Sequence, residues 1–561
     1  MKTSFHHVSR TLLLFGGLAT GLLAPHVAHA AAAPGQDLRL SYRSAIDDTD
    51  QPYRIYIPTQ YNADRAWPLI VAMHGTGGTE ATLFDGYEND GAIKKAAEAN
   101  GALLVSPLGR GVSEFRGIGE NDIFCVLEDV AKRYRIDPTR IYLTGHSMGG
   151  TGAAYLALHH PDRFAAAAPL AAAYSFPWLA RNAATVPFLW VSGAKDSDFY
   201  MRGVLAGMDR MLKFGVPATL EVLPGEGHRG PVQDFNRVFA WLVAHQRNPH
   251  PKSYFFEVDT PLHGRAWWTA VEKIAAPGRM ATVRAEATGK NAVRFELENV
   301  AELSFGPDPT VFEVGQSIAV TIGDTVVAEK IIPAGQQLRL SGGPGRWRAD
   351  LQPARPEALT VYRRFPVAEA PEAIDMLGTE KRLANWITDA MRAATQADVA
   401  LYNPVYYRGL PIPKGTVDIV DIIQCSRPFD EELVTLRLTG REILVLLENN
   451  LPNPNGKREP ALAVNREGAG PIVQVSGLRY KYDLKQPVGK RVIESSLDPA
   501  RTYTVVMEGQ VTARNTLQLG KLFKNVAYTT TPIGFTTALY GHAARTGVIN
   551  PAREGRVEEV R

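Results

Sequence analysis

The chain has 561 residues, which is too long for one ordinary hydrophobic core and predicts two to four domains. Hydrophobic residues make up 45% and charged residues 21% of the sequence, so wholesale disorder and a fibrous protein are excluded. A net charge of +3 gives no basic surface for nucleic acid, and two cysteines cannot build a disulfide scaffold. We expect Cys125 and Cys425 to be two separate buried thiols.

The first thirty residues have the pattern of a secretory signal. Lys2 and Arg10 precede an apolar run over residues 11–23, and Ala28-His29-Ala30 fits the small-x-small rule for cleavage. The run is too short to span a bilayer comfortably, although an uncleaved anchor is the alternative. We expect residues 1–30 to be removed, and the rest to be exported to the periplasm or the outside without stable membrane insertion.

The remaining chain changes texture twice, which predicts three domains. Between 36 and 250 short apolar runs alternate with helix-like segments, a pattern typical of a mostly parallel, doubly wound α/β sheet. Strands are expected at 67–73, 102–105, 141–144, 188–192 and 219–223, and helices at 123–134 and 148–159. Residues 253–354 alternate with period two and predict a small all-β, sandwich-like module. Residues 358–545 predict a mixed α/β domain, in which Thr439 and Glu442 form a capping box.

The predicted chemistry begins at a Gly-x-Ser-x-Gly segment, Gly145 to Gly149. An apolar strand runs directly into this segment and a helix follows it, which is the context of a nucleophile elbow. The sharp turn would hold the Ser147 hydroxyl clear of the sheet, at the N-terminus of a helix. We therefore predict Ser147 as a nucleophile, and His146 beside it as a packing residue.

A serine nucleophile needs a base and an acid, which follow it in the order acid, then histidine. Asp196 comes directly after the strand expected at 188–192, and His228 follows the strand expected at 219–223. Both loops should leave the same sheet edge as Ser147. We predict His228 as the general base and Asp196 as the acid that orients it. Asp198 is the alternative acid.

A glycine-rich turn, His74 to Gly78, follows the strand expected at 67–73. Such a turn supplies a backbone N–H to the oxyanion hole, and the residue after the nucleophile supplies another. The expected donors are the backbone N–H groups of Thr76 and Met148. We expect His74 to support the loop.

These motifs resemble the α/β-hydrolase superfamily over about residues 40–248. The segments HGTGG, TGHSMGG, VSGAKD and GEGH look like those of secreted esterases related to feruloyl esterases and polyhydroxybutyrate depolymerases. They are also similar to the catalytic domains of prolyl-oligopeptidase-type peptidases. The resemblance implies a triad of Ser147, Asp196 and His228.

The last third is similar to the C-terminal domain of secreted 5′-nucleotidases, through segments such as LANWITDAMRAAT and PFDEELVTLRLTGREILVLLE. That resemblance implies ligand-binding positions at Arg408 and Phe429, although packing is the favoured role for Phe429. The chain lacks the Asp-x-His and Gly-Asn-His segments of the metal-binding phosphoesterase domain. Nucleotidase chemistry needs those metals and is therefore not expected.

The sequence as a whole predicts an exported serine hydrolase that cleaves small-molecule or polymeric carboxylic esters and needs no metal or organic cofactor. Three alternatives stay open: a serine peptidase with the same triad, a nucleotide- or glycan-binding exported protein, and an inert scaffold. Trp267-Trp268 in the β module could form an aromatic platform, but simple burial is the favoured interpretation.

Overall fold

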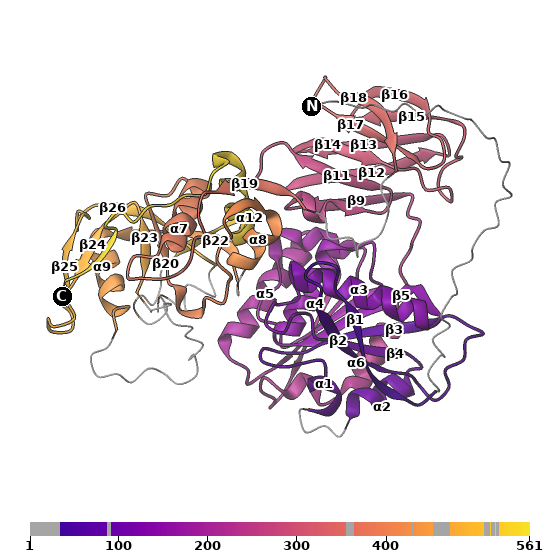
Figure 1. The fold of residues 1–561 in the computed structure, drawn as a ribbon, viewed down its shortest axis with the longest axis horizontal. Helices are drawn as coiled ribbons and strands as arrows, with labels where there is room; N and C mark the ends of the chain where they lie inside the picture. The colour runs from indigo at the N-terminus through magenta and orange to yellow at the C-terminus, as the bar shows by residue number, and fades with distance from the viewer. Residues whose placement is uncertain are drawn as a thin grey trace, which may run out of the picture.

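The computed structural model describes residues 34–86, 91–354, 364–427, 430–452, 472–509, 517, 522 and 527–560. The protein is a mixed α/β protein, and Figure 1 shows its parts in chain order: an α/β layer structure (indigo to magenta), a β module (pink) above it, and a third unit (orange to yellow) beside both. The segment expected to be a secretory signal lies outside the described residues. Among the helices that the structure describes, none is both long and apolar enough to cross a membrane.

An eight-stranded sheet forms the frame of the first part. Its strand order is β1-β2-β4-β3-β5-β6-β7-β8, and neighbouring strands are parallel from β4 to β8. β2 pairs antiparallel with both β1 and β4. The strands are β1 (Asp37–Arg43), β2 (Asp50–Tyr56), β3 (Trp67–Met73), β4 (Leu103–Pro107), β5 (Ile136–His146), β6 (Ala166–Leu170), β7 (Phe188–Gly193) and β8 (Ala218–Leu223).

Helices cover both faces of this sheet because successive side chains of its strands point to opposite sides. In β3, Leu69 and Val71 belong to one core, and Ile70 and Ala72 belong to another. The first core includes side chains of α3 and α4, and the second includes side chains of α2 and α6. The helices are α1 (Thr82–Asp85), α2 (Ala92–Ala99), α3 (Ile118–Arg133), α4 (Met148–His159), α5 (Asp198–Lys213) and α6 (Phe235–Val243).

Two five-stranded sheets make up the β module, with an aromatic core between them. Trp268 packs in this core and is only 4% exposed, whereas Trp267 is half-buried and lines an open pocket of about 410 Å³. The sheets contain β9 (Ser253–Val258), β10 (Arg265–Ala266), β11 (Thr269–Ile274), β12 (Ala281–Gly289), β13 (Ala292–Glu298), β14 (Val300–Phe305), β15 (Ser317–Ile322), β16 (Thr325–Ile331), β17 (Gln336–Ser341) and β18 (Arg348–Pro353).

The third part mixes helices with sheets of five, three and two strands. Thr439 begins α9 and forms the predicted capping box with Glu442, which is confirmed. Its strands are β19 (Pro366–Ala370), β20 (Val399–Tyr402), β21 (Gly415–Asp418), β22 (Glu432–Thr439), β23 (Gln474–Ser476), β24 (Tyr480–Tyr482), β25 (Val492–Ser495), β26 (Thr502–Met507), β27 (Tyr528–Gly534) and β28 (Val557–Glu559). Its helices are α7 (Arg382–Thr395), α8 (Ile419–Cys425), α9 (Gly440–Asn449) and α12 (Phe535–Thr546).

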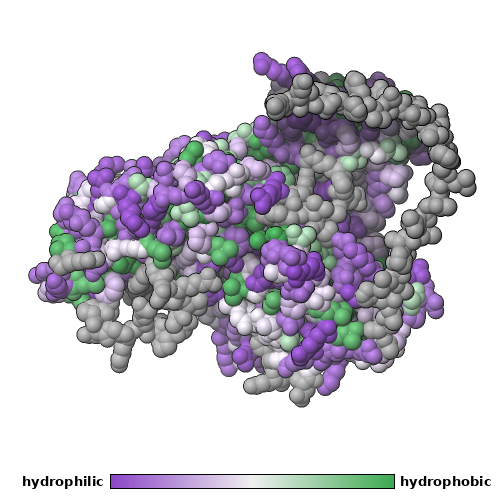
Figure 2. Space-filling view, in the orientation of Figure 1, coloured by the Kyte–Doolittle hydropathy of each residue, from purple (hydrophilic) through white to green (hydrophobic). Residues whose placement is uncertain are grey.

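Hydrophilic residues cover most of the face shown in Figure 2, and apolar residues lie between them in small groups. Scattered apolar residues of this kind are normal for a soluble surface and need no special explanation. Both cysteines are free thiols, as predicted, but only Cys425 is buried; Cys125 is half-buried, so the expected burial is wrong for this residue.

Candidate active site

Ser147 lies in a strained turn between β5 and α4. Its φ is 56°, a left-handed conformation that non-glycine residues rarely adopt, and its side chain is half-buried. The turn needs glycine next to it. A Cβ on Gly149 would come within 2.1 Å of the Met73 carbonyl oxygen, so only glycine lets α4 approach β3 this closely. Ser147 is therefore held at the carboxyl end of the sheet.

The loops after β7 and β8 bring Asp196 and His228 together. The Nδ1 atom of His228 lies 2.7 Å from Oδ2 of Asp196, and the Asp196 side chain is only 3% exposed. A backbone hydrogen bond from Lys195 N to the Glu226 oxygen, 2.7 Å long, joins the two loops. Asp196 also accepts a 2.7 Å hydrogen bond from the Ser197 N–H through its other oxygen, which fixes the carboxylate.

Asp198, the alternative acid, points elsewhere. Its side chain is 74% exposed and forms an ion pair with Arg202 one helical turn later. The structure thus pairs His228 with Asp196. Asp198 lies in the first turn of α5, where its negative charge interacts favourably with the helix dipole.

Tyr200, which no sequence motif singles out, lies against the histidine of the candidate triad. Its ring centroid lies 4.1 Å from that of His228, and its phenol lies near the Ser147 side chain. Burial raises the pKa of Tyr200 above its usual value, so the phenol stays protonated at neutral pH. It lies in the first turn of α5 and belongs to no motif that a sequence search would single out.

The two expected oxyanion donors follow neighbouring parallel strands, β3 and β5. Met73 is in register with Gly145, so the turn that contains Thr76 runs next to the turn that contains Ser147. Met148 is the first residue of α4, where backbone N–H groups have no partner within the helix. His74 is buried, and its two ring nitrogens contact the Gly75 and Leu108 carbonyl oxygens at 2.9 and 3.0 Å, consistent with support of the loop.

His146 packs against His228 with a ring-centroid distance of 4.8 Å. Its Nε2 lies 2.8 Å from the His228 carbonyl oxygen. Burial lowers the pKa of His146 to about 4, so this imidazole is neutral at pH 7 and can hold the His228 loop without adding charge.

The C-terminal part packs against the α/β part that contains this site. The buried Arg116, which precedes α3, donates to Asp430 and to Thr536, each at 3.0 Å. Arg427 donates to the Val112 carbonyl oxygen at 2.9 Å. On α5, Arg210 forms a 3.0 Å ion pair with Glu432. The first and third parts are therefore joined by buried polar contacts.

Arg408, the residue suggested as a nucleoside-binding arginine, faces this junction. Its Nε is buried and makes no hydrogen bond among the described residues, and its charge lowers the pKa of Tyr200. Phe429 lies outside the described residues.

Two family models match separate stretches of the chain. The model described as "Putative esterase" matches residues 126–199, and the model for the 5′-nucleotidase C-terminal domain matches residues 367–514. The chain therefore contains one stretch similar to esterases and another similar to the 5′-nucleotidase C-terminal domain. The esterase match contains both the Ser147 turn and Asp196.

Curated proteins resemble the same two stretches. The protein described as "Putative esterase NocK" of Nocardia uniformis subsp. tsuyamanensis is 30% identical over 141 residues, which cover 23% of this chain and 40% of that protein. The trifunctional nucleotide phosphoesterase protein YfkN of Bacillus subtilis (strain 168) is 30% identical over 123 residues, which cover 21% of this chain and 8% of that protein. The chain spans less than half the length of these relatives.

Among solved structures, the serine hydrolase FphF of Staphylococcus aureus is similar to this chain. The similarity covers 38% of this chain and 99% of the FphF chain. The two share 21% sequence identity, with a TM-score of 0.33.

Proposed function

We propose that this protein is an exported serine hydrolase that cleaves carboxylic esters through an acyl-enzyme. The observation that carries the proposal is the 2.7 Å contact between His228 Nδ1 and the buried Asp196 carboxylate, beside the strained turn of Ser147. The esterase family model supports the same reaction class over residues 126–199. Export rests on the signal pattern of residues 1–30.

Each residue then has a defined task. His228 takes the proton of the Ser147 hydroxyl as this oxygen attacks the ester carbonyl, and it later gives the proton to the leaving alcohol. Asp196 holds the imidazole so that Nε2 is the basic nitrogen, and stabilises the charge that His228 gains. The N–H groups of Thr76 and Met148 donate to the oxyanion of the tetrahedral intermediate. A water molecule activated by His228 then hydrolyses the acyl-enzyme.

A fluorophosphonate probe, which reacts with activated serines, tests the nucleophile directly. We expect it to label the wild-type protein and not Ser147→Ala, which should also lose ester turnover by several orders of magnitude. Ser197→Ala is the matched control, because this exposed serine lies one residue after Asp196 and makes no side-chain capping bond. Equal labelling of Ser147→Ala and the wild type would refute the assignment.

The competing enzyme function is a serine peptidase with the same three residues. A panel of p-nitrophenyl and feruloyl esters, run beside peptide amides of matched acyl groups, separates the two. We expect kcat/KM to be far higher for the esters, whereas comparable values for amides would favour the peptidase.

A nucleotide-binding role is the second candidate, because the 5′-nucleotidase C-terminal model matches residues 367–514. Calorimetric titration of the full-length protein with nucleosides tests it, with Arg408→Gln as the variant that should weaken any binding. No heat at millimolar nucleoside would remove this role and leave the hydrolase proposal unaffected.

A further inference from the structure

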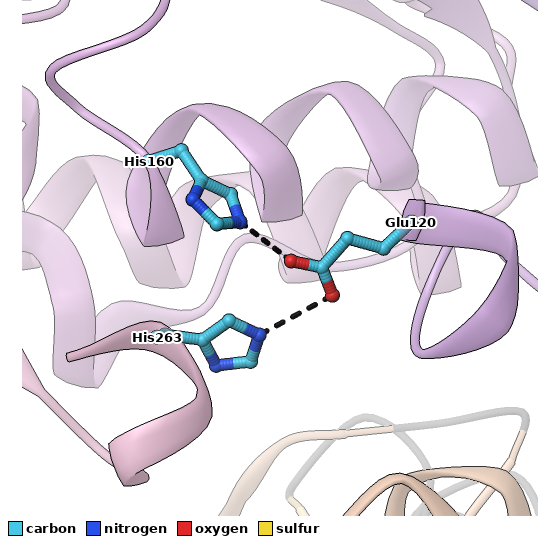
Figure 3. Close-up of side chains that lie close together, drawn as sticks. All are labelled: Glu120, His160 and His263. Atoms are coloured by element: carbon cyan, nitrogen blue, oxygen red, sulfur yellow. Dashed lines mark hydrogen bonds and ion pairs between the residues drawn. The ribbon is translucent and has the colours of Figure 1, made fainter. Parts of the chain in front are cut away.

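A second group of reactive side chains lies away from the candidate triad, at the junction of the α/β part and the β module. Glu120 comes from the first turn of α3, His160 from the end of α4, and His263 from the short helix η3 (Pro261–His263) of the β module. Figure 3 shows the three side chains pointing toward one another from these separate elements. All three are buried, with exposed fractions of 6%, 5% and 3%. We call these three residues the His–Glu cluster.

The ligand atoms of the cluster lie within reach of one metal ion. One Glu120 oxygen is 2.5 Å from Nε2 of His160, and the other is 3.3 Å from Nε2 of His263. One such atom from each residue lies within 4.8 Å of the others. Ligand atoms around a tetrahedral ion with bonds of about 2.0–2.1 Å are about 3.3 Å apart. To share such an ion, the Glu120 oxygen and the His160 nitrogen would have to move apart by about 0.8 Å.

A carboxylate lies behind the His263 ring, as is usual for imidazoles that bind a metal. The Nδ1 atom of His263, on the ring side away from Glu120, lies 3.4 Å from a carboxylate oxygen of Asp259. Asp259 also contacts His159 Nε2 at 3.0 Å, and the other His159 nitrogen lies 2.9 Å from the Tyr155 carbonyl oxygen. A carboxylate behind an imidazole fixes the tautomer in which Nε2 is free to bind a metal.

The two buried carboxylates of the region need positive charge beside them. Glu120 and Asp259 are both buried, and a buried carboxylate is costly unless positive charge accompanies it. Arg116 stacks over the Tyr155 ring at 5.5 Å but forms its ion pair with Asp430. The other partners of the two carboxylates are the Tyr155 hydroxyl, 3.1 Å from Glu120, and imidazoles, which are neutral when they bind a metal. A divalent ion would then balance the two carboxylates.

We propose that Glu120, His160 and His263 bind a Zn²⁺ ion that holds the β module to the α/β part. Two imidazoles and one carboxylate are ligands that zinc accepts readily. This departs from the sequence-based expectation that the chain needs no metal. The ligands are separated by 40 and 143 residues from Glu120, so no short spacing motif reveals them.

The site is structural. His160 follows the C-terminal end of α4, whereas Ser147 precedes its N-terminal end, and a helix of 12 residues is about 18 Å long. The ion is therefore too far from Ser147 to act on the substrate. Because the cluster is buried and draws its ligands from two domains, the ion would enter during folding, and its binding energy would add to the stability of the folded chain.

Metal content of the untagged, full-length protein tests the proposal. We expect about one zinc per chain by mass spectrometry of the elements, and loss of that zinc in Glu120→Gln and His160→Gln. His250→Gln is the matched control, because it removes an imidazole from a half-exposed ion pair with Asp308 outside the cluster. Zinc that remains in both cluster variants as in the control would be bound elsewhere and would overturn the proposal.

Refolding gives a second measurement that does not depend on the folding of the variants. The wild type is unfolded in denaturant with a chelator and refolded with Zn²⁺, with Co²⁺ or with chelator alone. We expect a higher melting temperature with Zn²⁺, and the visible absorption of tetrahedral Co²⁺ with Co²⁺. A wild type that takes up neither ion and melts at the same temperature in all three would show that the imidazoles neutralise the carboxylates alone, and would overturn the proposal.

Discussion

The imidazole of His228 and the carboxylate of Asp196 meet at 2.7 Å between loops that follow two neighbouring parallel strands, β7 and β8. The carboxylate is buried while the imidazole keeps 32% of its side-chain surface exposed. This difference suits a pair in which the acid only orients the base, because the base must still reach the nucleophile and the substrate.

The pairing predicts different effects for two aspartates that lie two residues apart. Asp196→Asn should lower kcat for esters by about 10³–10⁴-fold, because the amide no longer stabilises the imidazole tautomer and charge. Asp198→Asn should stay within about twofold, because it removes only an exposed ion pair with Arg202. Steady-state kinetics on one ester with both variants measures this. The reverse order of effects would identify Asp198 as the acid.

We expect the phenol of Tyr200, next to the candidate nucleophile, to contribute to the rate of ester hydrolysis. Tyr200→Phe keeps the ring against His228 but removes the phenol oxygen near Ser147. We expect kcat to fall by about tenfold, which corresponds to about 1.4 kcal/mol and is the usual net contribution of one hydrogen-bonding group. The melting temperature should stay close to that of the wild type. Unchanged kinetics would limit Tyr200 to a packing role.

The elements with strong patterns were the ones that sequence reasoning could find. The apolar run at 67–73 coincides with β3, and the helix expected at 148–159 coincides with α4. β6 was missed because its sequence, AAAPL, has no β-branched or aromatic residue and contains a proline. Only pairing with β5 and β7 makes this segment a strand, and such pairing is a tertiary effect.

Individual site residues were predictable where a motif supplies their context. The order of Ser147, Asp196 and His228 follows from the strands that precede them, but the choice between Asp196 and Asp198 needs three-dimensional geometry. Tyr200 and the His–Glu cluster were missed for a related reason. Their partners come from distant loops or from another domain, and a single sequence does not show which distant residues meet.

The buried pair of Arg116 and Asp430 predicts how firmly the third part is attached. Asp430→Ala would leave the guanidinium of Arg116, which is 1% exposed, with only the longer 3.6 Å ion pair to Glu114, and breaking a buried pair costs up to about 3–5 kcal/mol. We expect a clear drop in melting temperature. Arg116→Met combined with Asp430→Leu should recover much of it, because an apolar pair avoids the uncompensated charge. Arg202→Ala, at an exposed ion pair, is the control and should change stability by less than about 1 kcal/mol. A drop no larger than that of the control would show that the pair contributes little.

Because of Glu432, we expect the stability of the same junction to depend on pH. Burial raises the pKa of this carboxyl to about 7, although Arg210 acts against the shift. The folded protein therefore binds the proton more tightly than the unfolded chain, so the contribution to stability is full below pH 4.5 and is lost as the pH rises through about 7. Glu432→Gln should remove this term, which amounts to at most about 3 kcal/mol.

Melting temperatures at pH 5 and pH 8 measure the effect. The wild type should lose more stability than Glu432→Gln between the two values, because only the wild type must bury a carboxylate at pH 8 or release the contact with α5. Glu128→Gln is the matched control, since this glutamate is 44% exposed in an ion pair on α3 and should follow the wild type at both pH values. If Glu432→Gln loses as much stability as the wild type, then Glu432 ionises freely in the folded protein and the junction does not respond to pH through this residue.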